Sequence, residues 1–456
     1  MEREPGRYPV RVAVALVVLV LVTLGPIVAQ DTAQPASRYA LTAAIVDHHT
    51  VSLDRYQGTL GVDHAIYKGE WRSDKAPGQP FIAAPFYALE RVFGAEPATH
   101  LRESGNLSLW WVTFWSALVP LMVLLVLMIF MCARHQLRYG LVAVVSLGLC
   151  TMVLPHSVNL FGHVMCAAFA YGAWFVLDRE PVSATRLFAA GALAATAVTI
   201  EYEAGIILLV LAGYALVRER GRVLWFVAGT VPLFAFLGWY QARAFGAFWH
   251  TPSTYYAGVI GGTSKGGYST PTLHNLVDIF VGRRGLIIGA PIAIVGIVAA
   301  VWLGRTTTGV MRWHAVVGLA VIVPYLILVA GWSGTPILEE PGPRYLIPAL
   351  PFLAVPVAAM WTRLRSVNFL AAVFGALVAV SATFTFILLG INQSPVRGYA
   401  QAIRDGRFVP TLWSMGLGEL GVLCYLATVT AAGWFFFDAV RRDRVSSAAR
   451  ELALTR

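Results

Sequence analysis

Long stretches without a single charged residue are the feature that most limits how this chain can fold. Asn106–Ala133, Val223–Gln241 and Ser366–Val396 contain no Asp, Glu, Lys or Arg. Each is close to or above the roughly 20 residues that cross a bilayer core. Backbone in a bilayer must be helical or form a closed barrel, because its polar groups find no water there. The runs are continuous rather than alternating, which argues against a barrel.

Composition supports the same conclusion. Of the 456 residues, 57% are hydrophobic and 13% are charged, whereas soluble domains average about 25% charged residues. The sequence therefore predicts an all-α polytopic membrane protein with about 12 transmembrane helices. Tyr139–Leu177 is long enough for two of them, with a break at residues 154–157. The other predicted spans are Val12–Ala29, Leu187–Ile200, Ala204–Val217, Gly285–Gly304, Trp313–Leu338, Tyr345–Thr362 and Leu420–Phe437.

The distribution of charge predicts the orientation. With the N-terminus inside, the inner segments hold 19 Lys/Arg against 8 Asp/Glu, and the outer segments hold 15 against 16. This is the positive-inside pattern, so it explains the net charge of +10 without a nucleic-acid partner. We expect a multi-pass protein of the cell membrane with both termini in the cytoplasm. Residues 1–437 would form one transmembrane domain and residues 438–456 a short basic cytoplasmic tail.

The first outer segment, residues 30–105, is too long for a simple connection. Within it, Ser37–Asp47 and Pro80–Phe93 have apolar residues on one helical face. Both are interpreted as helices that lie along the membrane surface. Between them, Tyr67–Pro80 is dense in charged, aromatic and turn-forming residues. Function is therefore expected at the outer face, since long polar loops on a rigid scaffold commonly carry it.

Several acids in this loop are candidates for a catalytic base. Asp31 follows the first span directly, and a carboxylate at a membrane boundary is costly unless it is solvated or paired. Asp63 and Asp74 are further candidates. Lys75 precedes Ala-Pro-Gly, a stiff segment that can fix its direction. The alternative interpretation of each is an ordinary solvated charge or helix-end residue.

The order of these elements resembles the GT-C glycosyltransferases, which include protein O-mannosyltransferases and lipid A aminoarabinose transferases. A span is followed by Asp31, then by Arg38-Tyr39-Ala40-Leu41 opening a helix, then by Asp74-Lys75-Ala76-Pro77-Gly78. Thr32 stands where these relatives have a second acid. Later segments share the resemblance, which extends over about residues 10–355: Ala244-Phe245-Gly246, Tyr255-Tyr256, Arg284-Gly285-Leu286, Pro291 and Gly342–Phe352.

The resemblance implies a mannosyltransferase-like enzyme of the cell envelope. It would move a hexosyl or pentosyl group from a polyprenyl-phosphate donor to a glycan, lipid or protein acceptor on the extracytoplasmic face. A carboxylate would take the acceptor's proton, and cations would stabilise the departing phosphate. Because Thr32 replaces the second acid, Asp31 and Asp63 both remain candidates for the base. The residues expected to bind substrate are Arg38, Asp74, Lys75, Glu201, Glu339 and Arg344.

No cofactor is predicted. The histidines show no HxH or HExxH spacing, the four cysteines no CxxC pair, and nucleotide-binding glycine motifs are absent. A divalent metal is compatible with such an enzyme but is not indicated. The main alternative is a transporter or lipid flippase, although no internal repeat supports it. A structural or assembly factor of the envelope is a third interpretation. The expected partners are the lipid-linked donor, the acceptor and membrane lipids.

Overall fold

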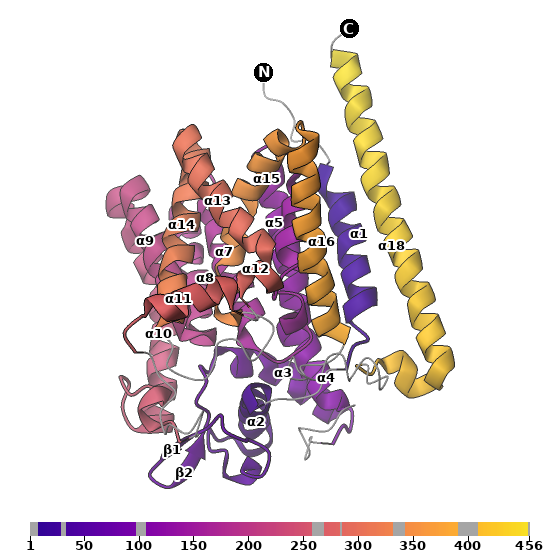
Figure 1. Ribbon diagram of the computed structural model, residues 1–456. Helices are drawn as coiled ribbons and strands as arrows, with labels where there is room; N and C mark the ends of the chain where they lie inside the picture. Colours follow the sequence, from indigo (N-terminus) through magenta and orange to yellow (C-terminus); the bar gives the residue numbers. More distant parts are fainter. Residues whose placement is uncertain are drawn as a thin grey trace.

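A computed structural model describes residues 8–28, 33–96, 106–257, 269–282, 285–331, 343–390 and 409–454. Its helices run back and forth between the two ends of a bundle (Figure 1). The strands within these ranges are β1 (Ala65–Tyr67) and β2 (Glu70–Arg72), which form one antiparallel hairpin. The all-α architecture predicted from the sequence is therefore confirmed.

Two short helices, α2 (Ala33–His48) and α3 (Gly78–Val92), lie with the hairpin at one end of the bundle (Figure 1). The beginning of α1 and the end of α18 lie at the opposite end. The remaining helices are α1 (Tyr8–Leu24), α4 (Leu107–Thr113), α5 (Val119–Arg134), α6 (Gly140–Val144), α7 (Gly162–Leu177), α8 (Ala184–Ile200), α9 (Gly205–Glu219), α10 (Val223–Phe245), α11 (Leu273–Val281), α12 (Leu286–Gly289), α13 (Pro291–Thr306), α14 (Gly309–Ala330), α15 (Ala354–Leu364), α16 (Asn368–Gly390) and α18 (Leu412–Leu454).

The helices are suited to a membrane. Within the described ranges, five are long and apolar enough to cross a bilayer, and a sixth span results if the pair that bends by 103° before Pro291 is one span. Five shorter apolar helices accompany them. These lengths and compositions indicate a membrane location. The number of about 12 spans stays a prediction.

The predicted breaks are partly confirmed. The long apolar run Tyr139–Leu177 is interrupted as expected: helix ends at Leu149 and begins again at Gly162, with the 3-10 turn Pro155–Ser157 between them. The predicted span Tyr345–Thr362, by contrast, is wrong in its first half, because α-helix begins only at Ala354. Two 3-10 turns precede it. Pro348 and Pro351 cannot donate the backbone hydrogen bonds that an α-helix needs there.

The two helices predicted in the first outer loop are present, but their surroundings differ. On α3, Val92 and the residue that follows it, Phe93, are more than 80% exposed, as expected for a helix at a membrane surface. On α2, every residue from 34 to 44 is buried. This part of α2 is thus covered by other parts of the protein, and Ser37 and Arg38 find polar partners there. The position of α2 along the membrane surface stays a prediction.

Close packing of glycines holds the middle of the bundle together. A Cβ on Gly191 of α8 would lie 2.8 Å from the Phe226 carbonyl carbon, and one on Gly229 of α10 would lie 2.9 Å from the Ala192 nitrogen. Small residues let helix backbones approach one another in membranes, where lipid offers no hydrophobic driving force between helices. The α8–α10 pair thus forms a rigid support for the loop that follows α8.

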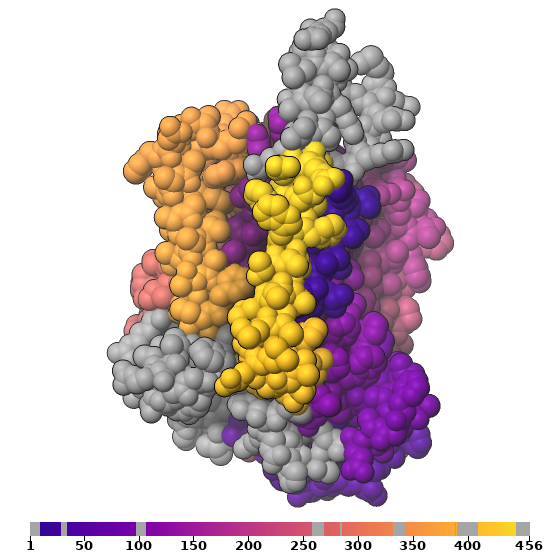
Figure 2. Space-filling model, turned by 90° about the vertical axis from the view of Figure 1, so that its right-hand side faces the viewer, coloured from indigo at the N-terminus to yellow at the C-terminus, as the bar shows by residue number. Residues whose placement is uncertain are grey.

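The long helix α18 lies at the periphery, against α1 and apart from α16 (Figure 2). Gly418 kinks it, with φ of 58°. At the end of the bundle that carries α2, a hollow of about 360 Å³ opens between α1, α4 and α18. Its lining is mainly apolar and comprises Leu21, Gly25, Pro26, Trp110, Phe114, Leu412, Trp413 and Leu417.

The arrangement predicts opposite accessibility for the two ends. Gln57, in the first loop, and Ser366, before α16, are both exposed. In a Cys424→Ser background, whose other cysteines are buried, Gln57→Cys should react with an impermeant maleimide from outside the cell. Ser366→Cys should react only after the membrane is permeabilised. Labelling of both from the same side would contradict the topology.

Stability should depend on the protonation of Glu90. Burial between α3 and α4 raises the pKa of Glu90 to about 7, although Ser108 donates a hydrogen bond to it. Between the ordinary value of 4.5 and about 7, the folded state keeps a proton that the unfolded state has lost. Stability should therefore fall as the pH rises through this window.

Thermal unfolding in detergent from pH 4.5 to 7.5 tests this expectation. Glu90→Gln should flatten the decline, because the side chain no longer titrates. The matched control is Glu96→Gln, at an exposed position just beyond α3, which should leave the decline as in the wild type. Equal pH dependence in the wild type and Glu90→Gln would show that the titrating group lies elsewhere.

Candidate functional site

A buried ion pair joins the first outer loop to the helical bundle. Arg38, on α2, donates from Nη2 to Oε1 of Glu201 over 2.6 Å. Glu201 lies between α8 and the 3-10 turn Tyr202–Ala204, where α8 ends with an extended residue. The Arg38 side chain is 1% exposed and that of Glu201 9%. A charge buried this deeply is retained only when it is paired and hydrogen-bonded, so the pair fixes α2 against the end of α8.

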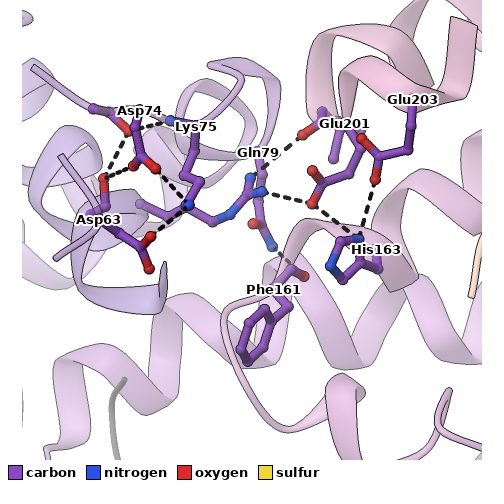
Figure 3. Close-up of polar contacts among 12 residues, drawn as sticks. Asp63, Asp74, Lys75, Gln79, Phe161, His163, Glu201 and Glu203 are labelled. Carbon is purple, nitrogen blue, oxygen red and sulfur yellow. Dashed lines mark hydrogen bonds and ion pairs between the residues drawn. The ribbon is translucent and has the colours of Figure 1, made fainter. Parts of the chain in front are cut away.

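A second charged group surrounds Lys75. Its Nζ lies 3.0 Å from Oδ1 of Asp63 and 2.7 Å from Oδ2 of Asp74 (Figure 3). Burial by itself would lower the pKa of Lys75, but the two carboxylates outweigh it and hold that pKa above its ordinary value. Burial raises the pKa of Asp74, and the charge of Asp63 adds to this while Lys75 opposes it. Lys75 is therefore a permanent cation beside two acids.

Local structure explains why these three residues meet. The hairpin pairs Ala65 with Arg72, so Asp63, just before β1, returns to the residues just after β2. Ser73 then accepts a hydrogen bond from the Lys75 backbone nitrogen at 3.2 Å, and its hydroxyl lies 2.9 Å from that of Ser37 on α2. The loop is thereby fixed to the same helix that carries Arg38.

The segment after Lys75 fits tightly against the bundle. A Cβ on Gly78 would lie 2.6 Å from the Thr199 carbonyl carbon, so only glycine allows this approach. Gln79 donates from Nε2 to the carbonyl oxygens of Ser116 and Phe161, each at 3.1 Å. The Ala-Pro-Gly sequence seen after Lys75 therefore has a physical role, which is to bring α3 onto α8.

The Ala244-Phe245-Gly246 motif supports the hairpin from the other side. Arg72 donates from Nε to the Ala244 carbonyl oxygen over 3.1 Å, and the rings of Tyr67 and Phe245 lie 6.3 Å apart. Gly246 adopts φ of 82°, and the Tyr67 hydroxyl occupies the space of its missing Cβ. Residues separated by more than 170 positions thus form one support for the Lys75 loop.

Beside Glu201, a fourth acid and a histidine complete the site. Nδ1 of His163, at the start of α7, lies 3.4 Å from Oε1 of Glu201 and 3.6 Å from Oε1 of Glu203 (Figure 3). His163 is fully buried, and its ring stands 5.1 Å from that of Tyr345. Arg344, next to Tyr345, places its guanidinium 5.3 Å from the Phe161 ring centroid.

The structure brings most of the predicted site residues to one end of the bundle. Asp63, Asp74 and Lys75 form one contact group and Arg38 with Glu201 another; the aromatic contacts above connect Arg344 to the second. Asp31, Glu339 and Arg284 lie outside the described residues. The role of each predicted residue remains a prediction.

Two members of the site were missed by the sequence analysis. His163 and Gln79 were not selected, although an apolar run interrupted by Pro155, His156 and His163 is unusual for a plain span. Gln79 carried no signal, because a glutamine next to a proline is common in loops. Its importance depends on contacts with two distant carbonyl groups.

A separate polar cluster lies at the opposite end of the bundle. Asp178 receives hydrogen bonds from Arg134 at 3.0 Å and from His135 at 2.7 Å. His314 Nε2 lies 3.0 Å from its other oxygen. Trp174 donates from Nε1 to Nδ1 of His314 over 3.2 Å. The hydrogen bonds from Arg134 and His135 and the close approach of His314 thus connect the end of α7 to α5 and α14.

Comparisons with known proteins identify similar structures only. No family model matches the chain, and no curated protein matches it. The crystal structure of ArnT from Cupriavidus metallidurans bound to undecaprenyl phosphate shares 15% identity over 96% of this chain and 79% of that one, with a TM-score of 0.48. The same protein in the apo state shares 17% over 95% and 77%, with a TM-score of 0.49.

The oligosaccharyltransferase of Archaeoglobus fulgidus in its apo form shares 13% identity over 93% of this chain and 60% of that one, with a TM-score of 0.46. ArnT and the oligosaccharyltransferase are membrane glycosyltransferases of the GT-C class, the class that the sequence motifs resemble. At these identities and TM-scores, the likenesses assign neither an activity nor a ligand to this chain.

The packing around Arg38 predicts that substitution by alanine has very different effects on stability at two glycines of α7. A Cβ on Gly162 would overlap Oε1 of Glu201 and lie 2.9 Å from Nη1 of Arg38, whereas one on Gly172 would meet only side-chain carbons at 3.7 Å and beyond. Gly162→Ala should therefore displace the ion pair and destabilise the protein by about 3 kcal/mol, within the usual cost of breaking a buried pair.

Gly172→Ala is the matched control. It should be neutral or stabilise α7 by about 0.5–1 kcal/mol, since alanine is the better helix former. Denaturation of both variants in the same detergent measures the difference. Equal stability of the two variants would mean that Gly162 does not support the ion pair.

Proposed function

We propose that this chain is a membrane glycosyltransferase that takes a sugar from a polyprenyl-phosphate donor and passes it to an acceptor at the outer face. The observation that carries the proposal is the Lys75 ammonium, 14% exposed at its side chain, which lies between Asp63 and Asp74 at one end of an apolar helical bundle. A cation at that position can meet a lipid phosphate, and the carboxylates beside it can accept a proton.

The charges suit transfer from a phosphate. The leaving group is a phosphate that is already a weak base, so it needs cations more than a general acid. Lys75 provides a point charge, and Arg344 provides a planar guanidinium that can bind two oxygens at once. The Arg344 guanidinium lies 5.4 Å from the Tyr345 ring centroid. A donor phosphate held between Lys75 and Arg344 would displace part of the contact between Lys75 and its two acids.

The carboxylates supply the second requirement. An acceptor hydroxyl must lose its proton as it attacks the anomeric carbon, and a placed carboxylate contributes about 10²–10⁴-fold to such a step. Asp63 is 13% exposed at its side chain and already contacts Lys75. Asp31 remains the other candidate for the base. The hollow of about 360 Å³ at the same end of α1 offers apolar surface for part of an isoprenoid chain.

A transporter fits the described structure less well. Transporters commonly hold their substrate near the bilayer midplane, between repeated halves with matching broken helices. Here the acids and cations of the candidate site lie at one end of the bundle, and they come from the first loop as well as from the bundle. Both enzymes and transporters can bind lipid phosphates, so the deciding experiment is transfer itself: sugar released from a labelled lipid donor and recovered on an acceptor.

Donor binding should depend on the two proposed phosphate ligands. Lys75→Ala and Arg344→Ala are each expected to weaken binding of a polyprenyl-phosphate sugar at least tenfold. Arg344→Lys should restore it only in part, because the lysine lacks the two-oxygen fork. Lys68→Ala is the matched control, since Lys68 is exposed on the same hairpin. Binding in nanodiscs and the thermal stability of each variant are measured together, and wild-type affinity in a stable Lys75→Ala protein would remove Lys75 from the site.

Removing the catalytic base should lower turnover much more than it weakens donor binding. If Asp31 is the base, Asp31→Asn should lower the turnover number by about a hundredfold or more, with donor affinity little changed, and Asp63→Asn should cost less. The reverse ranking would make Asp63 the base. Near-normal turnover in both variants would exclude a base at either position.

A further inference from the structure

His163, Glu201 and Glu203 converge without forming hydrogen bonds to one another. The ligand-type atoms of the three side chains lie within 4.8 Å of one another. His163 Nδ1 is 3.4 Å from one carboxylate oxygen and 3.6 Å from the other. Two atoms bound to one tetrahedral ion with bonds of about 2.1 Å lie about 3.4 Å apart. The observed separations therefore leave room for an ion at the centre of the group.

The buried polar atoms of this group lack partners. Among the described residues, neither ring nitrogen of His163 has a hydrogen bond, and Oε1 of Glu203 accepts none. The His163 side chain is 1% exposed and that of Glu203 7%. An unpartnered buried polar atom costs free energy, and a carboxylate costs more. A cation bound by all three side chains would remove these costs together.

The pairing of the neighbouring charges points in the same direction. Lys75 pairs with Asp63 and Asp74, and Arg38 pairs with Glu201. Among the described residues, Glu203 forms no ion pair with a lysine or arginine, and its Oε1 lies 3.6 Å from Nδ1 of His163. Arg38 occupies one lone pair of Glu201 and holds its carboxylate in place, as outer partners of metal ligands commonly do. Its positive charge would also limit the affinity for a cation.

We propose that His163, Glu201 and Glu203 bind a divalent transition-metal cation. One imidazole with two carboxylates suits zinc, cobalt or manganese, whereas calcium and magnesium prefer oxygen ligands alone. The HxH and HExxH spacings could not reveal this site, because its ligands come from the start of α7 and from the loop after α8.

The cluster at the opposite end of the bundle provides the contrast. His135, Asp178 and His314 are also close together, but they are 2.7–3.0 Å apart, at hydrogen-bond distance. The Nε1–H group of Trp174 donates a hydrogen bond to Nδ1 of His314. Because Nδ1 accepts this bond, the single proton of a neutral His314 ring is on Nε2, the atom that faces Asp178. A protonated Nε2 has no lone pair with which to bind a metal. Among the described residues, no donor forms a hydrogen bond with either ring nitrogen of His163.

Cobalt binding to the full chain in detergent tests the proposal. After removal of metal with chelator, wild-type protein should bind one Co²⁺ per chain. Its visible absorption should show the intense bands of a four-coordinate ion, and added Zn²⁺ should abolish them. No donor or acceptor is present, so the result does not depend on the proposed transfer reaction: a protein inactive in transfer could still bind the metal, and an active one could fail to bind it.

Matched variants locate the ion. His163→Gln and Glu203→Gln should each lower Co²⁺ affinity at least tenfold and remove the visible bands, because each deletes one ligand with little change of shape. His135→Gln, at the opposite cluster, should bind like the wild type. Thermal unfolding without metal confirms that each variant is folded.

Three results would overturn the proposal. They are the absence of stoichiometric Co²⁺ binding by folded wild-type protein, retention of the bands by His163→Gln and Glu203→Gln, and loss of binding in His135→Gln alone, which would assign the ion to the other cluster. If Glu203→Gln fails to fold, Glu203→Asp replaces it: the shorter side chain keeps the charge and should weaken Co²⁺ binding while preserving the fold.

Discussion

The ion pair between Arg38 and Glu201 is the contact on which the arrangement of the α2 end of the bundle depends. It joins residues 163 positions apart and connects a helix of the first loop to the junction of two membrane helices. Neither charge could remain buried alone, since removing one partner of such a pair commonly costs about 3–5 kcal/mol. Because both are enclosed, α2 can occupy only one position against α8.

The other features of the site follow from that position. Ser37, next to Arg38 on α2, forms a hydrogen bond with the Ser73 hydroxyl. This bond fixes the loop that carries Lys75. The same contact places Glu201 beside His163. The helix α2 thus orients two groups: the charged residues around Lys75, and His163 with its neighbouring carboxylates Glu201 and Glu203. A loop of this length could adopt many arrangements, and the buried charge selects one of them.

The sequence is sufficient to predict the fold class and several residues of the candidate site, whose roles stay predictions. Apolar runs predict membrane helices because the bilayer requires both length and hydrophobicity, and the break at residues 154–157 was visible from Pro155 and its polar neighbours. Asp74 and Lys75 were found because they are adjacent in sequence to a stiff segment. The Arg38–Glu201 pair and the position of His163 could not be derived, because periodicity within a span carries no information about which distant loops meet. The burial of residues 34–44 of α2 was missed for the same reason, since it depends on distant parts of the chain.

The central claim is that the Lys75 end of the bundle receives the phosphate of a lipid-linked sugar. A structure of the protein with bound polyprenyl phosphate, determined in nanodiscs by electron cryomicroscopy, tests it most directly. We expect phosphate density within hydrogen-bond distance of Lys75 Nζ, with the isoprenoid chain leaving along apolar helix surface. Phosphate density at the opposite end, near Arg363 and Arg365, with none beside Lys75, would contradict it.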